Sequence, residues 1–430
     1  MRKSKYLVLS GLYFDFNDDL SEIKEIKSLF KNQNILDIER FNKLISIKEN
    51  QFEFYNLKFL YLPQNIKSID LCAFYKNQIQ ILDLSNCINL KNIDRFSFEE
   101  NQIKKLKLPK NIEIIRNVFA YNKIKLLDLS NYTKLEAIGF KSFEYNQIKQ
   151  LKLPQNIETI YAYAFKNNQI ESLDLSNCIN LNIISKCAFE YNQIKQLKLP
   201  KNIAIIGNFS FQHNQIESLD LSTCINLKYI GDYSFSSNQI KQLKLQQNIE
   251  NIRYFAFSNN QIEILDLSQF INLKIIGYGA FANNQIKQLK LPDSIKLIDV
   301  SAFSSNKIEI LDISNCTNLN NIKFGVMRYN KIKQLKLPKN IMTIEENAFE
   351  TNEIEILDLL EYNQLKNIFC YAFSSNPIKE VKILDNIEIE YDIDYYKNDM
   401  WNNFAKYYND NEKKTGDYKY IYNKWQWYPL

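Results

Sequence analysis

The sequence is poor in residues on which many enzymes depend. Its 430 residues include one histidine, His213, with eight glycines and eight prolines. One histidine leaves no Ser-His-Asp or Cys-His set to assemble, and so few glycines make a phosphate-binding loop unexpected. No Cys-x-x-Cys pair occurs among the seven cysteines, and no apolar run reaches the roughly 20 residues that span a bilayer. We therefore expect no enzyme activity, no metal, no cofactor and no transmembrane segment.

The charge is nearly balanced. Lys and Arg number 54 and Asp and Glu number 49, which gives a net charge of +5. A chain that is 45% hydrophobic and 24% charged has an ordinary globular composition. A balanced charge is not typical of a polyanion binder, so nucleic acid is not an expected partner.

Internal repeats dominate the sequence. The Asp of a Leu-Asp-Leu or Leu-Asp-Ile string recurs with steps of 46, 45 and then 46 residues, from Asp37 to Asp358. A second string, Leu-Lys-Leu-Pro, lies between these copies, so the period is a pair of half-units of about 22 and 24 residues. The alternation in Leu-x-Leu predicts a short strand with one buried face. Because one coil cannot bury that face alone, we expect about sixteen coils to stack and join their strands into a parallel sheet.

An asparagine recurs once per half-unit from Asn77 to Asn376, with Phe three residues before it, except at Met327, and Ile two residues after it. Its side-chain amide can satisfy loop backbone groups that no sheet reaches. We therefore predict a structural asparagine ladder, represented by Asn168, Asn192, Asn214 and Asn238.

The frame Leu-Pro-x-x-Ile-x-x-Ile-x-x-x-Ala-Phe-x-x-Asn-x-Ile-x-x-Leu, seen from Leu291 to Phe303, resembles the BspA-like leucine-rich repeats of bacterial surface proteins and some parasitic protists. The resemblance covers residues 34–385 and implies an α/β solenoid, a right-handed leucine-rich-repeat superhelix with a parallel sheet on one face. The chain departs from the family's usual pattern by placing Asn where Cys is common.

Charged residues follow the same period. The residue between the two buried leucines is acidic in one half-unit and basic in the other. The series is Asp83, Lys107, Asp128, Lys152, Asp174, Lys198, Asp220, Lys244, Asp266, Lys290, Asp312, Lys336, Asp358 and Lys382. In a register-matched sheet each Asp then lies between two Lys, which gives little long-range field. We favour a self-neutralising structural ladder over a charged binding strip.

Tyrosines occupy less regular positions on the coil edges. The candidate binding residues there are Tyr161, Tyr163, Tyr229, Tyr254 and Tyr278. Tyr is enriched at binding surfaces, which favours a binding role. An interpretation that we weigh equally is that these rings fill gaps between loops. The cysteines are expected to be small buried core residues and His213 a loop filler. A pair of carboxylates with glycosidase geometry stays open on spacing alone.

Both ends differ from the repeats. Residues 1–33 are expected to form an N-terminal cap, with a strand over Tyr6–Phe14 and a helix from Asp18 to about Phe30. The strand is favoured over a cleavable signal peptide because Ser10 and Gly11 interrupt the apolar stretch.

The segment 386–430 contains all three tryptophans, Trp401, Trp425 and Trp427. It is predicted to form a helix and a hairpin that either cap the last coil or present an aromatic patch to glycan or cell-wall polymer.

The function that these patterns favour is non-enzymatic macromolecular recognition, with a protein as the main ligand and a glycan or cell-wall polymer as a second class. The resemblance implies a surface-exposed or secreted adhesion-type protein. The lack of a clear signal peptide favours the alternative, an intracellular protein–protein scaffold, so localisation stays open between surface and cytoplasm. An enzyme is the third hypothesis and has no irregular acid pair to support it.

Overall fold

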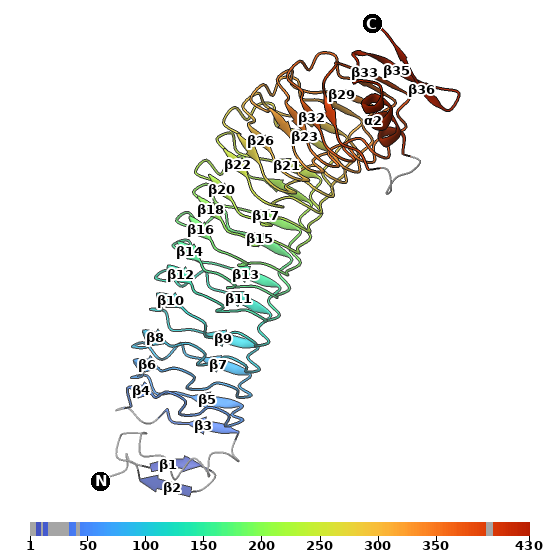
Figure 1. Ribbon diagram of the computed structural model, residues 1–430. Coiled ribbons are helices and arrows are strands. Elements are labelled where there is room, and N and C mark those ends of the chain that lie inside the picture. The colour runs from blue at the N-terminus through green and yellow to red at the C-terminus, as the bar shows by residue number, and fades with distance from the viewer. Residues whose placement is uncertain (1–5, 10–11, 16–33, 40–43, 393–398) are drawn as a thin grey trace. The chain divides into compact units, whose positions relative to one another are not determined.

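The computed structural model describes residues 6–9, 12–15, 34–39, 44–392 and 399–430. It divides into two compact units, Met1–Ile216 (unit 1) and Glu217–Leu430 (unit 2), which are described separately. In each unit, coils stack along the chain, with one column of strands on one side and a second column on another (Figure 1).

The first column is built from the Leu-x-Leu strings. Their middle residue points inward and the flanking residues face solvent, as the alternation predicts. In unit 1 these strands are β3 (Ile35–Asp37), β5 (Phe59–Tyr61), β7 (Ile81–Asp83), β9 (Lys105–Lys107), β11 (Leu126–Asp128), β13 (Gln150–Lys152), β15 (Ser172–Asp174) and β17 (Gln196–Lys198). In unit 2 they are β19 (Ser218–Asp220), β21 (Gln242–Lys244), β23 (Ile264–Asp266), β25 (Gln288–Lys290), β27 (Ile310–Asp312), β29 (Gln334–Lys336), β31 (Ile356–Asp358) and β33 (Glu380–Ile383).

These strands do not form one continuous sheet. Each Asp-bearing strand pairs in parallel with the strand that follows it, which bears a Lys in every pair except β3 with β5, and almost all such pairs are two-stranded sheets of their own. Coil length alternates, with 24 residues from Asp83 to Lys107 and 21 from Lys107 to Asp128. The expectation of a single joined sheet on this face is therefore wrong in detail, because coils of unequal length space their strands unevenly.

The second column consists of two-residue strands that end on a buried Ile in each coil. In unit 1 they are β4 (Ser46–Ile47), β6 (Ser68–Ile69), β8 (Asn92–Ile93), β10 (Ile114–Ile115), β12 (Ala137–Ile138), β14 (Thr159–Ile160), β16 (Ile183–Ile184) and β18 (Ile205–Ile206). In unit 2 they are β20 (Tyr229–Ile230), β22 (Asn251–Ile252), β24 (Ile275–Ile276), β26 (Leu297–Ile298), β28 (Asn321–Ile322), β30 (Thr343–Ile344), β32 (Asn367–Ile368) and β34 (Glu388–Ile389). All the pairs that these strands form within a unit are parallel.

The segment that leads from one strand column back to the other has no regular secondary structure, but its backbone angles repeat from coil to coil. Residues one and five positions before each ladder asparagine have positive φ, as at Lys76 and Cys72, although most are not glycine. Such a residue costs about 1 kcal/mol or more. Hydrogen bonds to the next coil offset this cost, for example from the amide of Cys72 to Arg95 O at 3.1 Å. Inside, the phenylalanines stack, with Phe74 and Phe98 centroids 5.2 Å apart.

The predicted solenoid of about sixteen coils is confirmed, since each unit contains eight coils with parallel strands. Its helical share is smaller than the label α/β implies. Among the described residues the one α-helix, α2 (Met400–Asp410), lies outside the coils.

The ends of the chain have structures of their own. In place of the single strand expected over Tyr6–Phe14, β1 (Tyr6–Leu9) and β2 (Leu12–Asp15) form an antiparallel hairpin. The helix expected from Asp18 to Phe30 lies outside the described residues. In unit 2, β35 (Gly416–Ile421) pairs with β36 (Lys424–Tyr428) and also lies antiparallel against β33, so it covers the edge of the last coil.

Candidate functional site

The ladder asparagines are buried and bond backbone on both sides. Asn192 accepts a hydrogen bond from Ile170 N at 3.1 Å and donates to Phe165 O at 2.9 Å and Phe189 O at 3.2 Å. Equivalent bonds are made by Asn168, Asn214 and Asn238. The donors and acceptors of these buried amides are hydrogen-bonded to backbone inside the solenoid, so they do not contact a ligand.

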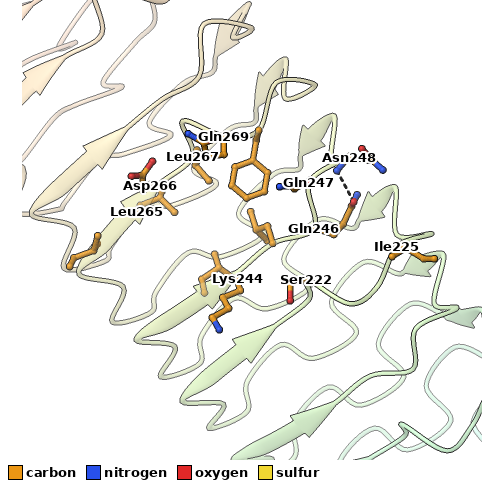
Figure 2. Close-up of a pocket in the computed structure, with 14 residues that line it drawn as sticks. Ser222, Ile225, Lys244, Gln246, Gln247, Asn248, Leu265, Asp266, Leu267 and Gln269 are labelled. Carbon is orange, nitrogen blue, oxygen red and sulfur yellow. Dashed lines mark hydrogen bonds between the residues drawn. The ribbon is translucent and has the colours of Figure 1, made fainter.

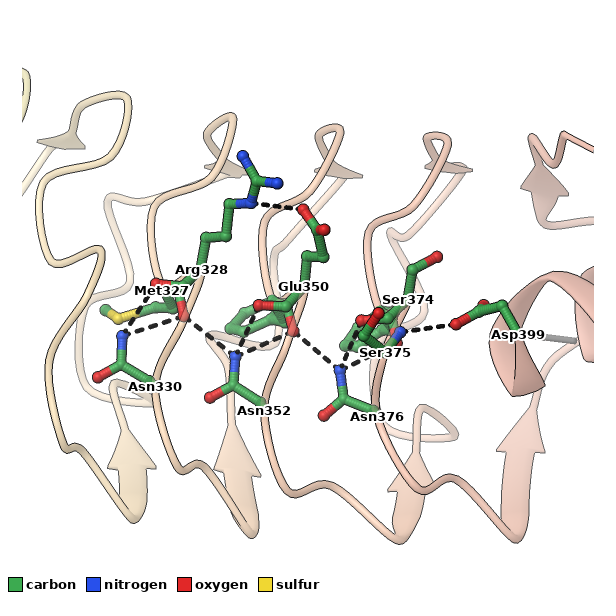
Figure 3. Close-up of polar contacts among 11 residues, drawn as sticks. Met327, Arg328, Asn330, Glu350, Asn352, Ser374, Ser375, Asn376 and Asp399 are labelled. Atoms are coloured by element: carbon green, nitrogen blue, oxygen red, sulfur yellow. Dashed lines mark hydrogen bonds and ion pairs between the residues drawn. The ribbon is translucent and has the colours of Figure 1, made fainter. Parts of the chain in front are cut away.

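The ladder continues where its aromatic neighbour is missing. Figure 3 shows Asn330, Asn352 and Asn376 in three successive coils of unit 2. Met327 stands where other coils have Phe, and its carbonyl accepts hydrogen bonds at 3.1 Å from both Asn330 and Asn352. The bonds use backbone carbonyls, so the change of side chain leaves them intact.

The Asp and Lys series forms discrete ion pairs. In six of the hydrogen-bonded strand pairs the Lys Nζ lies within 4 Å of an Asp oxygen on the preceding strand. The distances are 2.9 Å for Asp83–Lys107, 3.7 Å for Asp128–Lys152, 3.3 Å for Asp174–Lys198, 3.6 Å for Asp220–Lys244, 3.6 Å for Asp266–Lys290 and 3.8 Å for Asp312–Lys336. Within either unit, no ion pair among the described residues joins an Asp to the Lys before it. The expected position of each Asp between two Lys therefore gives contact with only one of them in these six pairs, because the strands pair in twos. Lys382 departs as well: its Nζ lies 3.5 Å from Glu380 and not beside Asp358.

Each Asp also has a local partner that sequence reasoning missed. Asp128 accepts hydrogen bonds from Ser130 N at 3.0 Å and Ser130 Oγ at 2.6 Å. These bonds, more than the Lys152 charge, lower the pKa of the Asp128 carboxyl below its usual value. The Ser that recurs two residues after Asp could have predicted these bonds. Each Asp therefore stabilises the turn after its strand, in addition to pairing with a Lys.

A second charged series runs three residues before the first. Lys287 Nζ lies 3.0 Å from Glu263, and Lys379 Nζ lies 3.2 Å from Glu355. Both series are therefore largely neutralised within themselves in unit 2.

Exposed isoleucines lie between these two series on every second strand of this face from β23 to β31 in unit 2. Ile264, Ile310 and Ile356, the first residues of β23, β27 and β31, are 63%, 58% and 59% exposed. The partners of the first two in the register are Gln288 and Gln334. We call these three isoleucines the isoleucine stripe. Sequence reasoning overlooked it, although an apolar residue two positions before the Asp was visible.

The tyrosine candidates fall into two groups. Tyr161, Tyr254 and Tyr278 are exposed, whereas Tyr163 and Tyr229 are partly buried. Tyr163 lies beneath Lys141 and Lys166, whose Nζ atoms are 5.6 and 5.4 Å from the ring centroid. Such rings pack against neighbouring cations, which fits gap filling as well as ligand contact.

The structure contradicts the binding role predicted for two of the tryptophans. Trp401 is fully buried and its ring centroid lies 4.9 Å from that of Phe373, at the end of the phenylalanine column. Trp425 is buried against Phe404. Both rings fill the core that α2 and the hairpin enclose, together with Phe404 and Tyr418. Trp427 is 38% exposed and is the one tryptophan whose ring is not buried.

All seven cysteines lie among the described residues, and none of them forms a disulfide. Cys87, Cys178, Cys224 and Cys316 are buried, and burial raises the pKa of each thiol to about 11. Cys72 and Cys370 are only partly buried, which corrects the expectation for these two.

In the part of the chain that the structure describes, no group of three or more His, Cys, Asp and Glu side chains is arranged to hold a metal ion. The same residues contain no helix long and apolar enough to cross a membrane.

Stacked coils of 22 to 24 residues with short parallel strands and an asparagine ladder define a leucine-rich-repeat protein. The family model described as the BspA type leucine rich repeat region, in six copies, matches residues 22–135, 113–226, 205–330 and 317–399. The chain therefore belongs to this family.

Solved structures similar to the chain include two bacterial leucine-rich-repeat proteins. The functional domain of InlJ from Listeria monocytogenes, which includes a cysteine ladder, is 16% identical with a TM-score of 0.46 over 84% of this chain and 78% of that one. The leucine-rich effector protein YopM from Yersinia pestis is 20% identical with a TM-score of 0.41 over 87% of this chain and 93% of that one. Comparison with curated proteins finds no match. These likenesses say nothing about a ligand.

Proposed function

We propose that the chain is a non-enzymatic recognition protein whose sheet face in unit 2 binds another protein. The observation that carries this proposal is the isoleucine stripe. Three large apolar side chains, more than half exposed, recur at one position between two series of charges that cancel locally. Apolar residues ringed by polar ones mark interaction surfaces.

The residues of the isoleucine stripe and its rim indicate which kind of partner surface would bind there. Apolar contact at the centre and alternating charges at the rim fit a protein surface with an apolar centre and both signs of charge around it. A strongly charged polymer fits less well, because Asp266 and Lys290 already neutralise each other at 3.6 Å.

The test uses the full chain as bait for surface-protein and cytosolic extracts of the source cells. The variant Ile264→Gln/Ile310→Gln/Ile356→Gln places in each strand the residue that β25 and β29 have at this position, so folding should be retained. Ile271→Gln, at a residue that is 77% exposed away from the stripe, is the matched control.

A partner retained by the wild type and the control, and bound at least about tenfold more weakly by the triple variant, is the expected result. Equal retention by the triple variant would overturn the proposal.

We also propose that recognition takes place at the cell surface. Family membership supports this, since BspA-like repeats are known from bacterial surface proteins. Protease treatment of intact cells tests it: cleavage of the chain is expected, and complete protection while a known surface protein is cut would favour the intracellular scaffold.

A further inference from the structure

A cavity of about 550 Å³ opens in unit 2 between β21 and β23 (Figure 2). These strands share no hydrogen-bonded register, because β21 pairs with β19 and β23 with β25. The cavity therefore occupies a gap between two strand pairs. Its size lies within the usual range for small-molecule sites, roughly 300–1,000 Å³.

Two departures from the repeat coincide at this gap. In the equivalent place two coils further on, Cys316 Sγ contacts Pro292 O at 3.6 Å. Here Phe270 replaces the cysteine and Gln246 replaces the proline. Gln246 is 3% exposed, and its side chain donates to Leu227 O at 2.5 Å and accepts from Asn248 N at 2.7 Å. The turn is thus fixed by an amide in place of a proline ring.

The lining is rich in neutral polar groups. The side chains of Gln247, Asn248, Gln269 and Ser222 surround the mouth, as Figure 2 shows. Among the described residues, the amides of Gln247 and Gln269 have no hydrogen-bond partner. An amide both donates and accepts, so these groups suit a ligand that does the same.

The charges at the gap are already engaged. Lys244 lies 3.6 Å from Asp220, and Asp266 lies 3.6 Å from Lys290 while accepting hydrogen bonds from Ser268. Apolar surface comes from the half-buried ring of Phe270 and from the exposed Ile225. A ligand that is neutral, carries hydroxyl and amide groups and has a small apolar part fits this lining.

We propose that this gap, lined by Ser222, Ile225, Gln247, Asn248, Gln269 and Phe270, binds an N-acetylhexosamine unit of a glycan. The acetamido group would exchange hydrogen bonds with the Gln247 and Gln269 amides, its methyl would contact Phe270 and Ile225, and the ring hydroxyls would reach Ser222 and Asn248. This site goes beyond the proposed protein binding and does not depend on it.

Isothermal titration of the full chain with N,N′-diacetylchitobiose tests the site, with cellobiose as the matched sugar that has hydroxyls in place of the acetamido groups. We expect binding of the first in the range of about 0.1–10 mM and binding of the second at least tenfold weaker. Gln247→Ala and Gln269→Ala should each weaken binding by about 3- to 10-fold.

A variant that restores the usual repeat residues at this gap, called the restoring variant, distinguishes loss of the site from misfolding. Gln246→Pro/Gln269→Asn/Phe270→Cys installs the residues found in the coil that contains Pro292, Asn315 and Cys316, so it should fold and lose the sugar. Tyr362→Cys makes the same kind of change at a different coil and should leave binding unaltered. No binding by the wild type at about 10 mM, equal binding of both sugars, or binding retained by the restoring variant would each overturn the proposal.

Discussion

Removal of one ladder amide should cost far more stability than removal of an exposed one. In Asn192→Ala, the buried Ile170 N–H loses its partner at 3.1 Å, while Phe165 O keeps a bond from Asn168. One orphaned donor costs about 1–3 kcal/mol, and the two lost amide bonds and the vacated volume add about 1 kcal/mol. We therefore expect the free energy of unfolding to fall by about 2–4 kcal/mol.

Asn202→Ala is the matched control. Asn202 also donates to a backbone carbonyl, Ile179 O at 2.8 Å, but it is exposed, so water can replace it. Its loss should change stability by no more than about 0.5 kcal/mol. Urea unfolding of both variants beside the wild type, followed by far-UV circular dichroism, gives the comparison. Equal shifts of the two unfolding midpoints would refute the account of the ladder.

Three further outcomes follow from the charges and from the tail. Asp220→Lys should reduce the free energy of unfolding by roughly 0.2–1 kcal/mol for the lost Lys244 pair, and by more for the lost serine bonds, so the melting temperature at low salt should fall without loss of folding; an unchanged melting temperature would count against the ladder. Burial raises the pKa of Glu99 to about 7 from 4.5, so the folded chain retains a proton that the unfolded chain loses, and stability should fall as pH rises from about 4.5 to 7. Glu99→Gln should flatten that slope in thermal melts at pH 5 and pH 8, and an identical slope would contradict it. Deletion of residues 398–430 should give an insoluble chain, because it exposes Phe373 and the edge of β33; a soluble, folded product would show that the tail is not a cap.

Much of the fold could be predicted because every coil repeats the same physical problem. The buried Leu of each strand, the Phe column and the ladder asparagine all follow from packing one coil on the next, so the period alone identifies them. Pairing of strands in twos depends instead on how alternating coil lengths space the strands. That is why Lys107 contacts Asp83 and not also Asp128.

The candidate sites were harder to predict because they depend on tertiary exposure. Trp401 and Trp427 belong to one aromatic segment, yet one is buried against Phe373 and the other is partly exposed. The gap at Gln246 and Phe270 lies between two strand pairs, and a gap lined by the corresponding residues recurs at Leu337 and Tyr362, so the broken repeat positions alone do not predict it.

Hydroxyl-radical footprinting of the full chain, free and with its captured protein partner, tests the central claim most directly. The sheet face of unit 2 is predicted to be the contact surface, so oxidation of Ile264, Ile310 and Ile356 should fall on binding while oxidation of Ile271 stays unchanged. Unchanged oxidation of the isoleucine stripe, with protection at Tyr254, Tyr278 or Trp427 instead, would contradict it.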